Sequence, residues 1–414
     1  MWKRLALLLL LLGLGGMLCG CWDRTEIEDT AYVASIGVDA AGSEYLWTIR
    51  IVDPTQLSMG MLTAQPAREA LTGGTIVVRA TSLEQAVQLA QASVMRIISL
   101  EHVRWLSFGE EAARRGVSHV LGNFLRHNQM RRTVPIYVFR GQTLQGFIYN
   151  RPVGDVNPMK FFEDVRLVEK RMHLSAPISL QHFYSRLISH GVDPTTSVVG
   201  VNLDATHPLD EEPPPMDGRS LRAGEFPRRG GNPVEFAGMA IFHDDHLVGI
   251  LDVDQTADLL ALRGEMGKVY ASSPVPGRPG EYITFRFHQE NKPQFRAAFV
   301  NGRPTVKVKL QFEAEVLSKP ETFDYTIPEN RRTLEEFTAR HWKTTVLDPM
   351  LQQIYHEWGA DPVGFGQLFR TRFATYDDWL NYDWHGHLRD LTVETEVTLF
   401  IRRYGLLLGP ALKK

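Results

Sequence analysis

Tyr32-Val33-Ala34-Ser35-Ile36-Gly37-Val38-Asp39 is followed, a few residues later, by Tyr45-Leu46-Trp47-Thr48-Ile49-Arg50-Ile51-Val52. In both stretches apolar side chains alternate with polar or small ones, which is typical of a half-buried β-strand. Ala41-Gly42-Ser43 lies between them and suits a short turn. We therefore predict two paired strands here, which open the folded part of the chain.

The residues after this pair alternate between strand and helix patterns. Residues 75–80 predict a third strand. In 82–99 apolar residues recur at helical period behind a capping box that starts at Thr81 or Ser82, so one helix is expected there. Further patterns predict strands at 103–108, 134–139 and 197–204, a broken helix at 110–127, and helices at 159–172 and 179–189. Such an alternation is typical of a mixed α/β unit.

The periodic pattern stops at 205–233, where prolines, glycines and arginines stand among acidic residues. This composition predicts an interdomain linker or a long exposed loop. Beyond it, His243-Asp244-Asp245-His246 predicts a hairpin turn, and Asn301-Gly302 predicts a second hairpin with a primed turn, where Pro304 can lengthen the loop. The predicted elements of this half are strands at 235–242, 247–251, 295–300, 305–317 and 391–403 and helices at 256–263, 334–358 and 362–373, with Pro349 kinking the longest helix or beginning a second one.

The length of the chain indicates more than one domain. Its 414 residues exceed the limit of about 250 to 300 residues for a single core, so two or three domains are expected. We predict an α+β fold with mixed or antiparallel sheets flanked by helices. The predicted division is a signal peptide at 1–20, an N-terminal α/β domain at 21–204, a flexible linker or loop at 205–234, a small middle domain at 235–280 and a C-terminal α+β domain at 281–414.

The amino-terminal run has the three parts of a secretory signal and ends in Leu18-Cys19-Gly20-Cys21. Lys3 and Arg4 form its basic start. The apolar stretch that follows has roughly 14 residues, whereas a helix that crosses a bilayer needs about 20. The L-x-G-C order resembles the lipobox of bacterial lipoproteins, whose cysteine carries thioether-linked diacylglycerol. We therefore expect the mature chain to begin at a lipidated Cys21; an uncleaved or conventionally cleaved leader is the alternative.

Lipidation at Cys21 has consequences for attachment and for stability. Two or more acyl chains, palmitate among them, hold a protein durably at a bilayer, whereas a single chain holds it only marginally. All later residues would then lie on the outer side of the membrane. The chain has two cysteines. Because Cys19 leaves with the signal and Cys21 is acylated, we expect no disulfide.

Charge and hydropathy exclude some partners. Removal of Lys3 and Arg4 leaves 43 basic against 48 acidic residues, a formal charge of −5, with no long basic run. Nucleic acid is therefore not an expected partner. The mature chain has no further apolar stretch near 18 residues, so membrane contact is expected through the lipid and through partner proteins.

No pattern in the sequence predicts catalytic, cofactor-binding or metal-binding residues. His243-Asp244-Asp245-His246 holds four potential ligands, but adjacent side chains of a tight turn point in different directions. Asp383-Trp384-His385-Gly386-His387 has an alternating histidine pair, yet no third ligand is identifiable and aromatic neighbours favour packing. Asp252, Asp254 and Thr256 begin like a calcium loop that lacks its glycine and its glutamate, so Asp254 or Thr256 is expected to cap the next helix. Neither a G-x-S-x-G turn nor an H-E-x-x-H helix occurs.

The amino-terminal junction resembles the opening of a known family. Leu18-Cys19-Gly20-Cys21-Trp22-Asp23-Arg24-Thr25-Glu26-Ile27, followed by 33–39, is similar to the start of the Ger(x)C family, the lipoprotein C subunits of nutrient germinant receptors in endospore-forming bacteria. Further matches in chain order are Gly238-Met239-Ala240-Ile241-Phe242, Leu247-Val248-Gly249, residues 306–315, Gly359-Ala360-Asp361, Gly364 to Gly366, and residues 393–403 with Gly405. The resemblance covers essentially the whole mature chain, with departures at 213–233 and 157–172.

This resemblance implies a function without catalysis. The chain would be a non-enzymatic receptor subunit on the outer face of the cell membrane or spore inner membrane, beside the integral membrane A and B subunits. It would have an α+β fold in three domains and help the receptor respond to small nutrients, whose direct binding here stays open. Cys21 is the one position that receives a defined role, lipidation.

Two other classes of function are weaker. A lipoprotein that binds a solute for a transporter is the alternative, but such proteins have two similar lobes around a cleft, whereas the two halves here differ in pattern. An anchored hydrolase or cell-wall enzyme is disfavoured because the nucleophile and metal motifs are missing.

Overall fold

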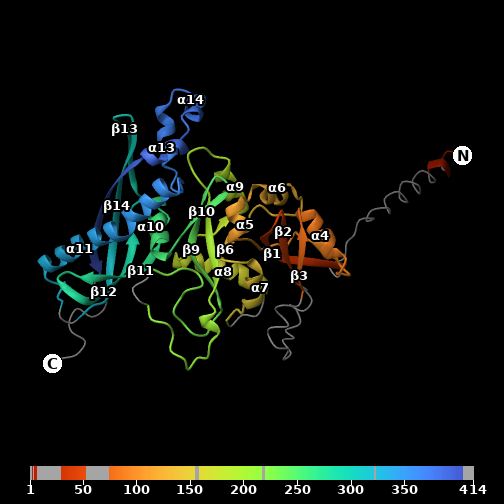
Figure 1. Cartoon of the computed structure of the whole chain (residues 1–414), viewed down its shortest axis with the longest axis horizontal. Coiled ribbons are helices and arrows are strands. Elements are labelled where there is room, and N and C mark those ends of the chain that lie inside the picture. Colours follow the sequence, from red (N-terminus) through yellow and green to blue (C-terminus); the bar gives the residue numbers. More distant parts are fainter. Residues whose placement is uncertain are drawn as a thin grey trace.

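The computed structural model describes residues 2, 4–6, 29–52, 74–153, 158–216, 220–320 and 323–403. Two sheets occupy different halves of the molecule, with helices packed on them (Figure 1). One sheet is mixed and the other is largely antiparallel. The α+β fold predicted from the sequence is confirmed. Cys21 lies outside the described residues, and no described helix is long and apolar enough to span a bilayer.

The first sheet is built around β1 (Thr30–Ala41), which contains the stretch predicted from the alternation at 32–39. β1 pairs antiparallel with β2 (Glu44–Val52), and β2 pairs antiparallel with β3 (Thr75–Ala80). The other strands of this sheet are β4 (Ile97–Ser99), β5 (Trp105–Gly109), β6 (Pro135–Phe139), β7 (Ile178–Ser179), β8 (Thr195–Val201), β9 (Val234–His243) and β10 (His246–Leu251). Their order is β10-β9-β8-β6-β5-β1-β2-β3, with β4 beside β1 and β7 beside β6.

The middle of this sheet is parallel and its two ends are antiparallel. The pairs β1–β5, β5–β6 and β6–β8 are parallel, so helical crossovers must connect them. The helices of this half are α4 (Leu83–Gln91), α5 (Glu110–Arg115), α6 (Ser118–Arg126), α7 (Thr143–Tyr149), α8 (Pro158–Met172) and α9 (Leu180–Leu187). The mixed α/β character expected for the first 200 residues follows from these crossovers.

The second sheet is formed around the long strand β14 (Arg303–Ser318). β14 pairs antiparallel with β12 (Arg278–Gln289) and β13 (Gln294–Val300) and parallel with β15 (Thr392–Arg403), and β11 (Lys268–Val275) extends the sheet beyond β12. Alternate residues of β14 are buried, so one face of this sheet meets the core and the other meets solvent. The helices of this half are α10 (Val253–Arg263), α11 (Pro328–Trp342), α12 (Asp348–Gln352), α13 (Phe365–Phe369) and α14 (Tyr376–Asn381).

β9 is shared by the hydrophobic cores of the two halves. Ala240 and Phe242 pack in the core of the first sheet, whereas Met239 and Ile241 pack in the core that contains α10 and the second sheet. One strand can serve both because its successive side chains point to opposite faces. The hairpin assigned to a small middle domain is therefore hydrogen-bonded into the first sheet. The domain boundaries themselves stay a prediction.

The segment at 205–234 is, where described, a loop held against the first sheet. The buried Glu235 carboxylate accepts hydrogen bonds from Arg228 Nε at 2.9 Å, the Gly224 main-chain N–H at 2.8 Å and Asn202 Nδ2 at 2.7 Å. The main-chain N–H of Gly230 donates to the Ala205 carbonyl at 2.9 Å. A loop rich in proline and glycine is thus anchored by one acidic side chain of β9.

The helix predicted at 82–99 is shorter than expected. α4 ends at Gln91, whose amide Nε2 donates to the carbonyls of Val94 and Arg96 and whose Oε1 accepts from the Ile98 N–H. These bonds pair main-chain groups of the turn that follows α4. After this turn, β4 pairs parallel with β1. The apolar residues Ile97 and Ile98, counted as part of a helical face, belong instead to a strand.

Three local predictions in the second half are resolved by single residues. Asp252 caps α10, with Gln255 completing the capping box, so the cap lies before the positions predicted. Pro304 does not lengthen the second hairpin, because Val300 pairs with Arg303 across the two-residue turn Asn301-Gly302, both at positive φ. The long helix at 334–358 continues through π-helical turns at Lys343–Leu347 and Gln353–Glu357, with Pro349 in the first turn of α12.

Candidate functional site

The β9–β10 turn adopts the tight conformation that His243-Asp244-Asp245-His246 predicts. Asp244 has a φ of 51°, a conformation that aspartate tolerates better than most residues. Asp245 Oδ2 accepts from the Ser118 main-chain N–H at 3.0 Å, and its carbonyl accepts from the Val117 N–H at 3.0 Å. The turn is thereby fixed to the start of α6, and its side chains are held in place rather than free in solvent.

Asp193, in the loop before β8, connects this turn to the carboxyl-terminal part of the chain. Its Oδ1 accepts from the Asp244 main-chain N–H at 3.1 Å. Its Oδ2 accepts from the Asp361 N–H at 2.6 Å and lies 2.9 Å from His385 Nε2. The Asp193 side chain is only 2% exposed. A single buried carboxylate therefore joins three segments that are distant in sequence.

Asp361 is the second buried carboxylate of this region. Its two oxygens accept hydrogen bonds from Tyr355 Oη, from Trp384 Nε1 and from the main-chain N–H groups of residues 364, 365 and 366, at 2.7 to 3.0 Å. Burial raises the pKa of the Asp361 carboxyl, and the main-chain hydrogen bonds partly offset this effect. Asp361 thus fixes the loop that begins α13 and the indole of Trp384.

Two arginines converge on one main-chain oxygen beside these carboxylates. Arg263 Nε and Nη2 donate to the Pro362 carbonyl at 3.0 and 2.6 Å, and Arg186 Nη1 donates to it at 3.0 Å. Burial, together with the neighbouring charge of Arg186, lowers the pKa of the Arg263 guanidinium to about 9. Arg186 comes from α9 and Arg263 from α10. We call Arg186, Asp193, Arg263, Asp361 and His385 the junction cluster, because they connect the first sheet with the residues around α13.

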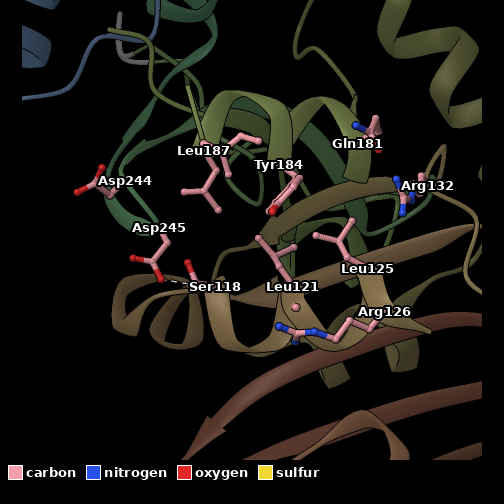
Figure 2. A pocket seen from close by; sticks show the side chains of 12 residues that line it. Ser118, Leu121, Leu125, Arg126, Arg132, Gln181, Tyr184, Leu187, Asp244 and Asp245 are labelled. Atoms are coloured by element: carbon pink, nitrogen blue, oxygen red, sulfur yellow. Dashed lines mark hydrogen bonds between the residues drawn. The ribbon is translucent and has the colours of Figure 1, made fainter. Parts of the chain in front are cut away.

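A pocket of about 500 Å³ lies beside the turn, between α6 and α9 (Figure 2). Asp244 and Asp245 stand at one end and Arg132 stands at the other, while the guanidinium group of Arg126 lies below Leu121, between the two ends. Apolar and aromatic side chains line the space between them: Leu121, Leu125, Tyr184 and Leu187. The pocket thus combines an apolar lining with charged groups of both signs, a combination that is common in ligand sites.

The structure separates the two histidines of Asp383-Trp384-His385-Gly386-His387. His385 faces Asp193, whereas His387 stacks on Tyr382 with ring centroids 4.2 Å apart and bonds to the Asp383 carbonyl. The alternating pair therefore does not act together on one ligand. Trp379 and Trp384 are buried, so the packing expected for the neighbouring aromatic residues is confirmed.

Asp193 is the site residue that sequence reasoning missed. Its partners Asp361 and His385 lie 168 and 192 residues away, and no local pattern relates them. Gly191-Val192-Asp193-Pro194 reads as an ordinary turn. The available signal was indirect: a histidine at 385 without a nearby second ligand, and acidic residues next to prolines at 193 and 361.

Comparison with protein families matches both halves of the chain. Residues 23–201 match the spore germination protein N-terminal domain, and residues 237–405 match the spore germination B3/GerAC-like C-terminal domain. The chain belongs to the GerAC-like, or Ger(x)C, family of spore germination proteins. The resemblance noted at its amino-terminal junction is confirmed.

Relatives of this GerAC-family chain are similar over nearly their whole length. The putative spore germination protein YfkR of Bacillus subtilis (strain 168) is 25% identical over 399 residues, 94% of each chain. Spore germination protein KC of the same organism is 20% identical over 410 residues, 95% of this chain and 94% of that protein. The crystal structure of the GerBC protein shares the fold, with a TM-score of 0.53 at 15% identity over 92% of this chain and 99% of that one.

Proposed function

We propose that this chain is a lipid-anchored, non-enzymatic subunit of a spore nutrient germinant receptor, and that it supports germination through contacts with integral membrane subunits. The observation that carries the proposal is the family match of both halves, in order, over residues 23–201 and 237–405. Matches of this extent assign the chain to spore germination as a whole protein, and its finer role is inferred from its amino terminus and its surface.

The anchor is inferred from the leader. A basic start, an apolar stretch of roughly 14 residues and L-x-G-C before the processing point favour transfer of diacylglycerol to Cys21 over a membrane span. Each buried methylene contributes about 0.8 kcal/mol, so a cysteine with two or three acyl chains holds the folded part at the outer face of the membrane. This attachment would hold the protein at the membrane that contains the integral receptor subunits.

A role through contacts with other proteins is favoured because the buried carboxylates of this region have structural tasks. The carboxylates of Asp193 and Asp361 accept main-chain and side-chain hydrogen bonds that hold loops together, and their side chains are buried. Carboxylates used in this way position loops. Confinement by the lipid would raise the effective concentration of the protein for the integral A and B subunits.

A solute-binding component of a transporter is less well supported. Two similar lobes around a cleft would be expected for it, but the first sheet is mixed with a parallel middle and the second is largely antiparallel. The pocket between α6 and α9 is lined by residues of the first half alone.

The experiment replaces Cys21 by alanine in the spore-forming host and follows the protein by fractionation. We expect Cys21→Ala to shift the protein out of the spore membrane fraction, to slow nutrient-triggered germination, and to leave the fold intact. Cys19→Ala is the matched control, since it lies in the same leader two residues earlier and is expected to leave membrane attachment unchanged. Membrane retention of Cys21→Ala equal to that of Cys19→Ala would contradict the proposed anchor.

Co-purification tests the proposed partners. The tagged chain, extracted from spore membranes in mild detergent, is expected to bring the two integral receptor subunits with it, in amounts that fall when Cys21 is replaced. Recovery of the chain alone under conditions that preserve a known membrane complex would contradict the receptor assignment.

A further inference from the structure

Three potential metal ligands from distant segments converge at the junction cluster, and two of them, Asp193 and His385, belong to it. Asp193 comes from the loop before β8, His243 from the end of β9, and His385 from the turn after α14. One ligand atom from each lies within 4.8 Å of the other two. The histidine rings stand nearly perpendicular with centroids 4.8 Å apart. We propose that Asp193, His243 and His385 bind one divalent transition-metal ion of the zinc type.

The unpartnered nitrogen of His243 is an independent observation that points to a ligand. Its Nδ1 is buried and has no hydrogen-bond partner, while its Nε2 lies 4.0 Å from Asp244 Oδ2. A buried polar atom without a partner costs free energy and calls for an explanation such as an ion. An ion held by the imidazole would satisfy this ring.

One pair of ligand atoms already has nearly the separation that a tetrahedral ion requires. Metal–nitrogen and metal–oxygen bonds near 2.0 to 2.2 Å place ligand atoms about 3.3 Å apart. The Asp193 Oδ2 to His385 Nε2 distance is 2.9 Å, so these two atoms need to separate by a few tenths of an ångström. The ligand atom of His243 lies within 4.8 Å of the other two, and the side chain of His243, which is 37% exposed, has to move toward them.

The carboxylate of this site is held in place by its surroundings. The main-chain N–H groups of Asp244 and Asp361 donate to the two oxygens of Asp193 and fix its orientation. Ligating carboxylates in metal sites are commonly oriented in this way by outer hydrogen bonds. The His385 side chain is 24% exposed, so an ion can reach the site from solvent.

The ligand types determine the class of ion. Two imidazoles and one carboxylate suit Zn²⁺ and related first-row ions, whereas Ca²⁺ and Mg²⁺ prefer oxygen ligands alone. Three protein ligands leave a fourth position for water. Such an ion would connect the loop before β8, the β9–β10 turn and the turn that begins at His385, and so would hold the two halves of the molecule together.

The test titrates Zn²⁺ into the purified, chelator-treated full-length protein and measures binding by calorimetry and the melting temperature. We expect one tightly bound ion per chain, a rise in Tm with Zn²⁺, and, with Co²⁺ in its place, the visible absorption of a tetrahedral site. His243→Gln and His385→Gln are each expected to weaken the affinity by more than about 100-fold. Their Tm without metal shows whether each variant is folded.

Two matched controls separate this site from surface binding by other histidines. His246→Gln changes the other histidine of the same β9–β10 turn, and His387→Gln changes the other histidine of the 385–387 pair. Both are expected to bind Zn²⁺ as the unmodified protein does. The proposal is overturned by equal affinities of His243→Gln and His246→Gln, or by binding that does not saturate at one ion per chain.

Discussion

The main-chain N–H of Asp361 donates a hydrogen bond of 2.6 Å to the carboxylate of Asp193, which lies 168 residues earlier in the chain. The return bond runs from the Asp193 N–H to the Asp361 carbonyl at 2.8 Å. This reciprocal pair joins the loop before β8 to the loop before α13. These two hydrogen bonds, together with the strand β9 that both hydrophobic cores share, connect the two sheets.

Replacement of Asp361 by alanine is expected to destabilise the protein strongly. Five donors, one hydroxyl, one indole and three main-chain N–H groups, would lose their acceptor in a buried place. Since each buried unsatisfied group costs about 1 to 3 kcal/mol, we expect a loss of at least about 3 kcal/mol in the free energy of unfolding. Thermal and urea unfolding measure this. Asp377→Ala, an exposed position in α14, is the control and should change little; an equal effect of both variants would refute the assigned role.

Replacement of Gly249 in β10 by alanine is expected to destabilise the protein, because even a methyl group does not fit there. A Cβ built there lies 2.2 to 2.4 Å from three atoms of the Trp358 indole, so Gly249→Ala forces the two halves apart at this contact. Overpacking of this kind typically costs about 1 to 3 kcal/mol. The double variant Gly249→Ala with Trp358→Leu should lose less stability than the sum of the single changes. Strict additivity would show that the indole does not limit this position.

Asp258 of α10 makes stability depend on pH. It is fully buried, and neither carboxylate oxygen has a partner at hydrogen-bond geometry. Burial raises the pKa of this carboxyl well above its ordinary value, and the indole of Trp342 acts in the opposite direction. Between the ordinary and the raised pKa the folded state holds a proton that the unfolded state has lost. Stability from this group is therefore greatest at low pH and falls as pH rises toward the raised pKa.

Asp258→Asn should remove this pH dependence. At neutral pH we expect the variant to be more stable by about 1 to 3 kcal/mol, and the difference should vanish as pH falls toward 4. Urea unfolding across this pH range measures the difference, with exposed Asp377→Asn as the control. A variant that is less stable than the unmodified protein at every pH would mean that the carboxylate has a favourable partner.

Local sequence patterns predicted most elements because their causes are local. The alternation at 32–39 and 45–52 became β1 and β2, and Asn301-Gly302 produced its two-residue hairpin. The helix at 82–99 failed at Gln91, whose side-chain bonds to Val94, Arg96 and Ile98 have no periodic signature. The predictions that rested on hydrophobic periodicity were confirmed for the two strands. The predicted helix was too long because side-chain hydrogen bonds, which leave no periodic pattern, end it.

The candidate site was not predictable because its geometry depends on tertiary contacts. His243 and His385 stand in motifs that, taken separately, favour a turn and aromatic packing, and both interpretations hold locally. Only the pairing of β8 with β9 and the bond between Asp193 and Asp361 bring the two histidines to the same carboxylate. The sequence also did not indicate that β9 is buried on both faces. A strand that is covered on both sides lacks the alternation of apolar and polar residues by which a buried face is recognised.

The proposed lipidation of Cys21 is tested most directly by mass spectrometry of the amino-terminal peptide, purified from spore membranes. The account predicts a chain that begins at Cys21 and carries thioether-linked diacylglycerol on its sulfur. A peptide that begins at Met1, or a Cys21 with a free thiol, would contradict it.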